Sequence, residues 1–188
     1  HIACLALGLG YDDVVWTVPN TFVASSNCAL YCGAKVDFVD IDPKTANLSV
    51  KHLKRKLSLA KKVKNLPKIL IPVHFAGEPC DMVAIKSLSD EYGFKIIEDA
   101  SHAIGAQYQG RPVGSCEYSD ITIFSFHPVK IVTSGEGGAV LTNCPELDKR
   151  LKLLRSHGIT RDKSLMRYPS DDEWYYEQID LGFNYRMT

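Results

Sequence analysis

The sequence predicts an α/β domain in which a mainly parallel β-sheet is covered by helices on both faces. Three observations lead to this prediction. Short apolar runs alternate with amphipathic stretches along almost the whole chain. The apolar runs are nearly continuous, as in strands that are buried on both faces. A glycine follows most of the amphipathic stretches, as at the left-handed end of a helix.

Each element is expected from its own local signals. The expected helices cover residues 1–7, 21–32, 49–62, 81–92 and 145–157. The expected strands cover residues 14–18, 35–41, 68–74 and 94–98, followed by the apolar runs 120–126 and 137–142. Asn20 or Thr21 is the expected N-cap of the second helix. Leu53 and Leu57 lie on one face of the third helix, which is the face we expect to be buried.

Residues 120–142 (DITIFSFHPVKIVTSGEGGAVLT) hold the most informative pattern. Two β-rich runs flank a segment of proline, serine and glycine that can be neither a strand nor a helix interior. Lys130 lies in this segment between Val129 and Ile131, although lysine is normally solvated. Two interpretations remain open. The lysine stem packs while its amine reaches water, or the amine is desolvated, has a lowered pKa and forms Schiff bases.

A carboxylate follows another expected strand. Asp99 comes directly after the strand 94–98, and His102 lies three residues later. Asp99 could cap a following helix, but ligands of parallel sheets bind beyond the carboxyl ends of the strands. A carboxylate and Lys130 at neighbouring strand ends are the minimal pair for a pyridoxal phosphate site, where the lysine carries the aldehyde and the aspartate pairs with the ring nitrogen.

Four further side chains are candidates near strand ends. Phe22 follows the strand 14–18, and it could stack on a ring or belong to the core. Ser125 could bind a phosphate or only a backbone carbonyl. His74 and His127 are expected to be structural, since the sequence shows no partner for His74.

Composition narrows the function classes. Lys plus Arg and Asp plus Glu are equal at 22 each, so no overall charge favours nucleic acid or an anionic membrane surface. No apolar run approaches the roughly 18 residues that span a bilayer. Six scattered cysteines without a C-x-x-C pattern indicate buried thiols of a cytoplasmic protein, and neither a metal site nor a disulfide framework is expected. The phosphate-loop, dinucleotide, nucleophile-elbow and H-E-x-x-H motifs are missing.

Several motifs occur in a fixed order: PNTFVASSNCALYCGAKVDFVDID, IPVHFAGEPCDM, IIEDASHAIGA, VGSCEYSDITIFSFHPVK, TSGEGGAVLTN, LRSHG and LGFNYRMT. Together they resemble the DegT/DnrJ/EryC1/StrS sugar aminotransferases over essentially the whole chain. The resemblance implies the pyridoxal-phosphate-dependent transferase fold of the aspartate aminotransferase type, glutamate as the donor and a homodimer with shared active sites. Within this family, the sequences of these motifs are most similar to those of members that aminate a UDP-4-keto-6-deoxy-N-acetylhexosamine for the biosynthesis of pseudaminic acid.

The resemblance also implies roles for five residues of the predicted site. Lys130 would be the Schiff-base lysine and the base that moves the proton between Cα and C4′. Asp99 would pair with the pyridine nitrogen, and Ser125 would bind the phosphate. Phe22 would stack on one face of the ring. His102 would pack against the other face or reach the ring hydroxyl.

Residues near the end of the chain are implied to act across the dimer or on the substrate. Asn184 would reach the phosphate of the neighbouring subunit's cofactor. Tyr185, Arg186 and the charged, aromatic segment 160–178 would meet the nucleotide sugar. The hydrophobic residues of segment 160–178 follow neither a helical nor a strand periodicity, and loops of this length are usually functional or mobile.

The resemblance implies that residues 1–188 are a partial pyridoxal-phosphate-binding large domain. The phosphate-binding segment before His1 and the small domain after Thr188 would be missing. We therefore expect an active longer parent protein but little or no transaminase activity from the 188 residues alone. Turnover at the rate of the parent protein, measured on the isolated chain, would overturn this expectation.

Two other functions stay open. A pyridoxal- or pyridoxamine-phosphate-dependent dehydratase, lyase or deaminase would leave no new amino group on the sugar, so product analysis separates it. Members with histidine in place of the lysine act as dehydratases, and Lys130 argues against that. A non-catalytic regulatory member is the other alternative, although loss of Lys130 or Asp99 would have favoured it more.

Overall fold

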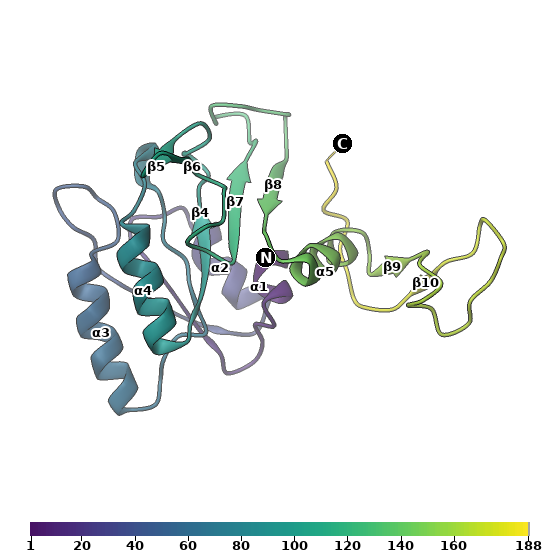
Figure 1. The fold of residues 1–188 in the computed structure, drawn as a ribbon, viewed down its shortest axis with the longest axis horizontal. Helices are drawn as coiled ribbons and strands as arrows, with labels where there is room; N and C mark the ends of the chain where they lie inside the picture. Colours follow the sequence, from purple (N-terminus) through teal and green to yellow (C-terminus); the bar gives the residue numbers. More distant parts are fainter. Residues whose placement is uncertain (188) are drawn as a thin grey trace.

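A six-stranded sheet forms the centre of the computed structural model, which describes residues 1–187 (Figure 1). Its strand order is β2-β1-β3-β4-β7-β8. The first five strands in this order are parallel, and β8 pairs antiparallel with β7. The strands are β2 (Lys35–Phe38), β1 (Val14–Thr17), β3 (Ile69–Leu70), β4 (Lys95–Asp99), β7 (Ile121–Ser125) and β8 (Gly138–Leu141). The predicted mainly parallel sheet is confirmed.

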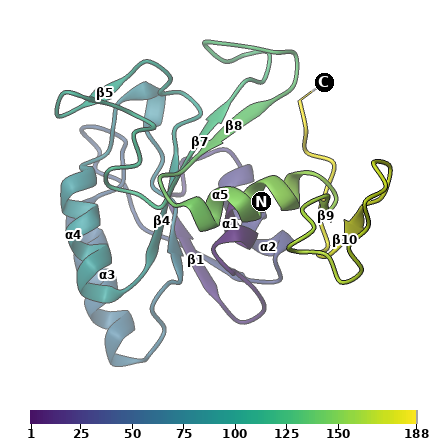
Figure 2. The same ribbon diagram turned by 45° about the vertical axis from the view of Figure 1, so that its right-hand side comes forward.

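Helices cover both faces of this sheet (Figures 1 and 2). One face carries α3 (Val50–Lys62) and α4 (Met82–Tyr92), and the other carries α1 (Ile2–Ala6), α2 (Ala24–Tyr31) and α5 (Pro145–Arg155). Successive strand residues point to opposite faces. Trp16 and Leu70 therefore pack in the first hydrophobic cluster, whereas Val15 and Ile69 pack in the second.

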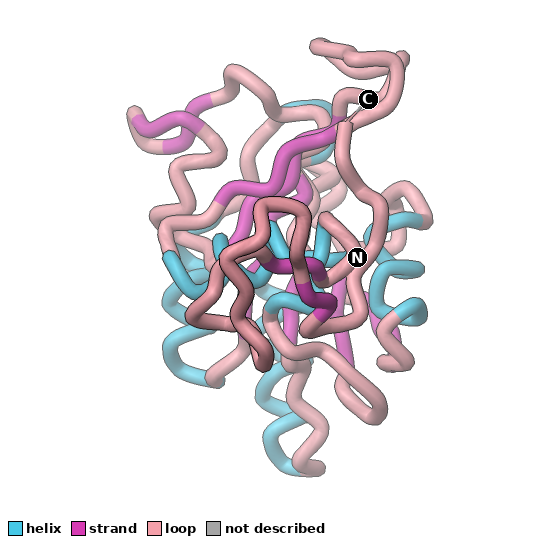
Figure 3. The backbone as a smooth tube through the Cα atoms, turned by 90° about the vertical axis from the view of Figure 1, so that its right-hand side faces the viewer, coloured by secondary structure: helices cyan, strands magenta, loops and turns pink. Residues whose placement is uncertain are grey.

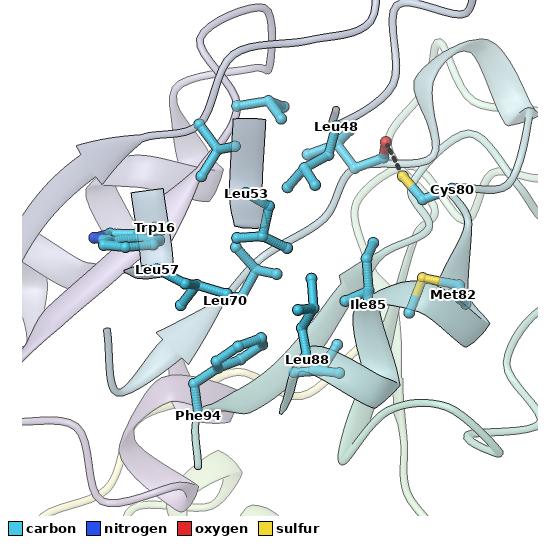
Figure 4. Packing of buried hydrophobic residues seen from close by; sticks show 14 of the residues in the cluster. Trp16, Leu48, Leu53, Leu57, Leu70, Cys80, Met82, Ile85, Leu88 and Phe94 are labelled. Atoms are coloured by element: carbon cyan, nitrogen blue, oxygen red, sulfur yellow. Dashed lines mark hydrogen bonds between the residues drawn. The ribbon is translucent and has the colours of Figure 1, made fainter. Parts of the chain in front are cut away.

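The first cluster shows why α3 and α4 form where they do (Figure 4). Leu53 and Leu57 are fully buried, as the spacing on α3 predicts. Ser49 caps α3 by accepting a hydrogen bond from the His52 N–H at 3.3 Å. Asp81 caps α4 in the same way, by accepting from the Ala84 N–H at 3.2 Å.

Three elements are at least three residues shorter than predicted. The second helix begins at Ala24 instead of residue 21, and neither Asn20 nor Thr21 caps it, because its N-cap is Val23. Strand β3 covers only two residues of the predicted 68–74, since Pro72 lacks the N–H that the ladder needs there. A bridge between Val73 and Asp99 resumes the parallel pairing after this proline. Strand β2 ends at Phe38 instead of residue 41.

Several short elements lie outside the central sheet. They are the 3₁₀ turn η1 (Phe75–Gly77), the hairpin β5 (Gln107–Tyr108) and β6 (Arg111–Pro112), and the pair β9 (Ile159–Thr160) and β10 (Glu177–Gln178). The chain between β9 and β10 extends away from the sheet, and Figure 3 shows it as loop. Among residues 1–187, no helix combines the length and the apolar character needed to cross a bilayer.

All six cysteines are free, but only Cys4, Cys80 and Cys116 are buried. The other three are partly exposed, so the prediction of buried thiols is wrong for half of them. Cys28 of α2 lies with its sulfur 3.7 Å from that of Cys4, which comes from α1. No group of three or more potential metal ligands occurs within the described part of the chain.

A buried polar network lies below the carboxyl ends of β3 and β4. The Cys80 N–H donates to His74 Nδ1 at 3.2 Å, so the neutral ring carries its proton on Nε2 and donates to Glu98 Oε2 at 2.8 Å. Thr122 donates to Glu98 Oε1 at 2.9 Å, and Ser119 donates to the same oxygen. Burial alone would raise the pKa of Glu98, but these hydrogen bonds outweigh it and hold the pKa below its ordinary value.

We predict that Leu57→Ala lowers the free energy of unfolding by about 2–5 kcal/mol, because it leaves a cavity among fully buried side chains. Leu59 lies on the same helix but is 54% exposed, so Leu59→Ala should change stability by less than about 0.5 kcal/mol. Denaturant unfolding of the two variants measures the difference. Equal losses would show that α3 packs differently.

A second prediction concerns acid stability. The folded pKa of Glu98 lies below the unfolded value, so the network stabilises fully above the unfolded pKa of about 4.3 and loses its contribution as pH falls through the folded pKa. Glu98→Gln should cost roughly 1–3 kcal/mol near neutral pH and flatten the acid limb of the stability curve.

Denaturant unfolding at several pH values checks this prediction, with Glu173→Gln as the matched control. The Glu173 side chain is exposed, so its variant should follow the wild-type curve. If Glu98→Gln also follows that curve, the network contributes nothing to acid stability.

Candidate active site

A cavity of about 540 Å³ opens at the carboxyl ends of the parallel strands. Its walls come from the β1–α2 connection, η1, the end of β4 and the β7–β8 connection. This is the position where ligands of open parallel sheets bind. The structure brings five sequence-predicted residues together in this cavity: Phe22, Asp99, His102, Ser125 and Lys130.

Asp99 is the last residue of β4, and hydrogen bonds fix both its side chain and its backbone. Its Oδ2 accepts a hydrogen bond from Ser25 Oγ at 2.6 Å, and its Oδ1 accepts from the Ser101 N–H at 3.1 Å. Its backbone bonds to β3-side residues, with the His74 N–H donating to the Asp99 carbonyl at 3.0 Å and the Asp99 N–H donating to that of Pro72 at 2.9 Å. No helix follows directly, so Asp99 is not a helix cap but closes a local turn.

Lys130 lies in a turn that leaves β7. Its N–H donates to the His127 carbonyl at 2.9 Å, and its side chain is partly buried. Among residues 1–187, no carboxylate lies within ion-pair distance of its amine. Val129 and Ile131 are 79% and 71% exposed, so the apolar neighbours of Lys130 do not belong to the core.

The remaining cavity residues form its sides. Phe22 is 76% exposed, which rules out the alternative that it is a core residue. Ser125 Oγ accepts from the His127 N–H at 3.4 Å, and its own proton is free to bind an anion. The carbonyl of His102 approaches Gly77 so closely that a Cβ there would lie 2.8 Å from it, and the φ of Gly77 is +89°. Only glycine fits this position.

Three other predicted residues lie outside the cavity. Asn184 forms an isolated backbone bridge with Ser156 and is exposed. The Tyr185 hydroxyl lies 3.1 Å from His1 Nδ1. Tyr185 and Arg186 line a separate hollow beside β8 and α5. The proposed role of Asn184 concerns a neighbouring subunit, so it stays a prediction.

Sequence reasoning missed two groups that surround Asp99. Thr21 and Ser25 line the cavity, and their hydroxyls lie 2.9 Å apart. Their four-residue spacing was the available signal, because it would place both on one side of the helix expected over residues 21–32. His74 also lines the cavity, and its partner Glu98 is apparent only once the strand register is known.

The cavity therefore combines an oriented carboxylate, an amine without an ion-pair partner in residues 1–187, an aromatic wall and a free hydroxyl. Such a set can hold a flat, anionic ligand that carries a carbonyl group. The carboxylate suits a protonated ring nitrogen, and the amine suits the carbonyl carbon.

Comparison with known proteins agrees with this arrangement. The profile of the DegT/DnrJ/EryC1/StrS aminotransferase family matches residues 1–188. The UDP-4-amino-4,6-dideoxy-N-acetyl-beta-L-altrosamine transaminase of Campylobacter jejuni subsp. jejuni serotype O:23/36 (strain 81-176) is 43% identical over 190 residues, which cover 100% of this chain and 46% of that protein. The chain spans about half the length of the curated relatives it matches.

Solved structures show the same fold. Helicobacter pylori PseC, an aminotransferase involved in the biosynthesis of pseudoaminic acid, aligns with a TM-score of 0.80 and 28% identity over 98% of this chain and 47% of that one. NtdA from Bacillus subtilis, solved with bound cofactor PMP, aligns with a TM-score of 0.77 and 30% identity over 97% and 37%. The predicted fold class, that of pyridoxal-phosphate-dependent transferases, is confirmed. The chain belongs to the DegT/DnrJ/EryC1/StrS aminotransferase family.

Proposed function

We propose that the protein is a pyridoxal-phosphate-dependent sugar aminotransferase, in which residues 1–188 form part of the cofactor-binding large domain. It transfers an amino group from glutamate to the C4 ketone of a nucleotide-linked 4-keto-6-deoxy sugar. One observation carries this proposal: Asp99 and Lys130 follow the adjacent strands β4 and β7 and line the same cavity.

The residues of the cavity fit the cofactor group by group. Pyridoxal phosphate supplies, when bound, an electron-withdrawing ring that lets a proton leave an amine-bearing carbon. Asp99 would hold the ring nitrogen, because Ser25 and Ser101 already orient its two oxygens. The Ser125 hydroxyl has a free proton for the phosphate. Phe22 and His102 would bound the ring faces from the two sides of the cavity.

Lys130 is the residue best suited to bind the aldehyde and to move the proton with its Nζ. A neighbouring carboxylate would favour the charged ammonium and oppose both tasks. None of the carboxylates in residues 1–187 pairs with Lys130, in contrast to Lys68, whose amine lies 2.8 Å from Asp13. The Lys130 amine can therefore accept and return a proton without first breaking an ion pair.

The substrate and the assembly are proposed from the family resemblance and the relatives. A UDP-4-keto-6-deoxy-N-acetylhexosamine for pseudaminic acid or a related surface glycan fits the transaminase relative and the PseC neighbour. We also propose a cytoplasmic homodimer in which Asn184 reaches the phosphate in the other subunit. Asn184 is exposed and does not line the cavity of its own subunit, which supports this role. Tyr185, Arg186 and residues 160–178 remain candidates for the sugar nucleotide.

Cofactor trapping tests the proposal on the full-length protein. Pyridoxal phosphate should give an absorbance band near the visible edge, and borohydride should fix the cofactor on the peptide that contains Lys130. Lys130→Ala should abolish trapping and lower amino transfer from glutamate more than about a hundredfold, because both the attachment point and the base are removed.

Lys35→Ala is the matched control. Lys35 is exposed at the start of β2, where it pairs with Asp12 outside the cavity, so its variant should trap cofactor as the wild type does. Label on another lysine, or amino transfer at an unchanged rate in Lys130→Ala, would refute the assignment. A protein that stays colourless would favour the non-catalytic alternative.

A further inference from the structure

We propose that Thr21 and Ser25 form a two-hydroxyl relay that positions Asp99 for the ring nitrogen of the cofactor. This inference rests on the proposed function, because it assigns the free side of the Asp99 carboxylate to that nitrogen. Neither hydroxyl would touch the reacting atoms. Both are therefore positioning residues.

The direction of the relay follows from counting protons. An ionised carboxylate only accepts hydrogen bonds, so the 2.6 Å contact between Ser25 Oγ and Asp99 Oδ2 uses the single proton of the serine hydroxyl. The 2.9 Å contact between Thr21 Oγ1 and Ser25 Oγ must then use the threonine proton. Thr21 donates to Ser25, and Ser25 donates to Asp99. Hydrogen bonds in such a chain polarise one another and become stronger.

The local fold explains why these hydroxyls are available. The second helix begins only at Ala24 and its N-cap is Val23, so Thr21 precedes the helix and its hydroxyl contacts that of Ser25. Ser25 is only 6% exposed, so its bond to Asp99 lies where water does not compete. The bond connects α2 to β4 across 74 residues of sequence.

The relay leaves a defined part of Asp99 free. Ser25 occupies Oδ2, and the Ser101 N–H occupies Oδ1 from the following turn. The rotation of the carboxylate is fixed by two donors from opposite sides. The lone pairs that remain can then face the cavity, which Asp99 lines together with Thr21 and Ser25.

A ring-nitrogen probe separates positioning from a simple contact between helix and strand. The probe is 1-deazapyridoxal phosphate, in which carbon replaces the ring nitrogen. The full-length wild type should bind pyridoxal phosphate roughly tenfold more tightly than this analogue, as expected for one charge-assisted hydrogen bond. Ser25→Ala should lose most of this preference. A merely structural role would weaken both ligands equally and leave their ratio unchanged.

Ser26→Ala is the matched control. Ser26 is the next residue of α2, and its hydroxyl donates to the Val23 carbonyl at 2.9 Å without lining the cavity. Its variant should keep the wild-type preference. Thr21→Val removes only the outer donor at nearly constant volume, and it should reduce the preference about two- to threefold. This variant also tests the relay if Ser25→Ala does not fold.

The two proposals fail in different ways. If the wild type prefers pyridoxal phosphate and both Ser25→Ala and Thr21→Val keep that preference, the relay is refuted while the proposed function stands. If Ser25→Ala does not fold, an unchanged ratio in Thr21→Val refutes the relay. A wild type that binds neither compound, or binds both equally, refutes the proposed role of Asp99 itself.

Discussion

The carboxyl end of β4 determines the layout of the site, because its last two residues point to opposite faces of the sheet. Glu98 points into the buried network with His74, whereas Asp99 points into the cavity. The backbone between them is fixed on both sides, through Pro72 and His74 next to β3 and through the Ala100 N–H, which donates to the Ile123 carbonyl of β7 at 2.9 Å. A shift of one residue in this register would exchange the two carboxylates.

Local sequence signals were sufficient to predict the sheet, the five helices and the position of Asp99 and Lys130 at one cavity. The end of α4 followed from Gly93, which has the left-handed conformation of a helix-ending glycine, whereas the expected cap at Asn20 or Thr21 is not used. Asp99 and Lys130 were predictable because each follows an apolar strand, and the carboxyl ends of parallel strands share one edge of the sheet. That argument assumes that the two strands are parallel and adjacent, as β4 and β7 are.

The partners of these residues were not predictable, since they depend on contacts that no local pattern encodes. Ser25 meets Asp99 only after α2 packs on the sheet, and the expectation of a helix cap at Thr21 gave no indication of the hydroxyl pair. Glu98 meets His74 only in the observed register. Val129 and Ile131 are apolar neighbours of Lys130 in the sequence, but both side chains lie on the turn after β7 and are exposed. Hydrophobicity of a short segment does not determine burial where the chain leaves the sheet.

The cavity is lined by both polar and apolar side chains. Ser25 is buried and Asp99 is partly buried, while Phe22 and Val129 are mostly exposed. Hydrogen bonds and charges act more strongly when water is excluded. Exposed apolar side chains that lie close together are typical of surfaces that another molecule covers. In the homodimer proposed above, covering Phe22 and Val129 would exclude water from the cavity and strengthen the contacts of Asp99, so assembly and the chemistry of the site would depend on the same few side chains.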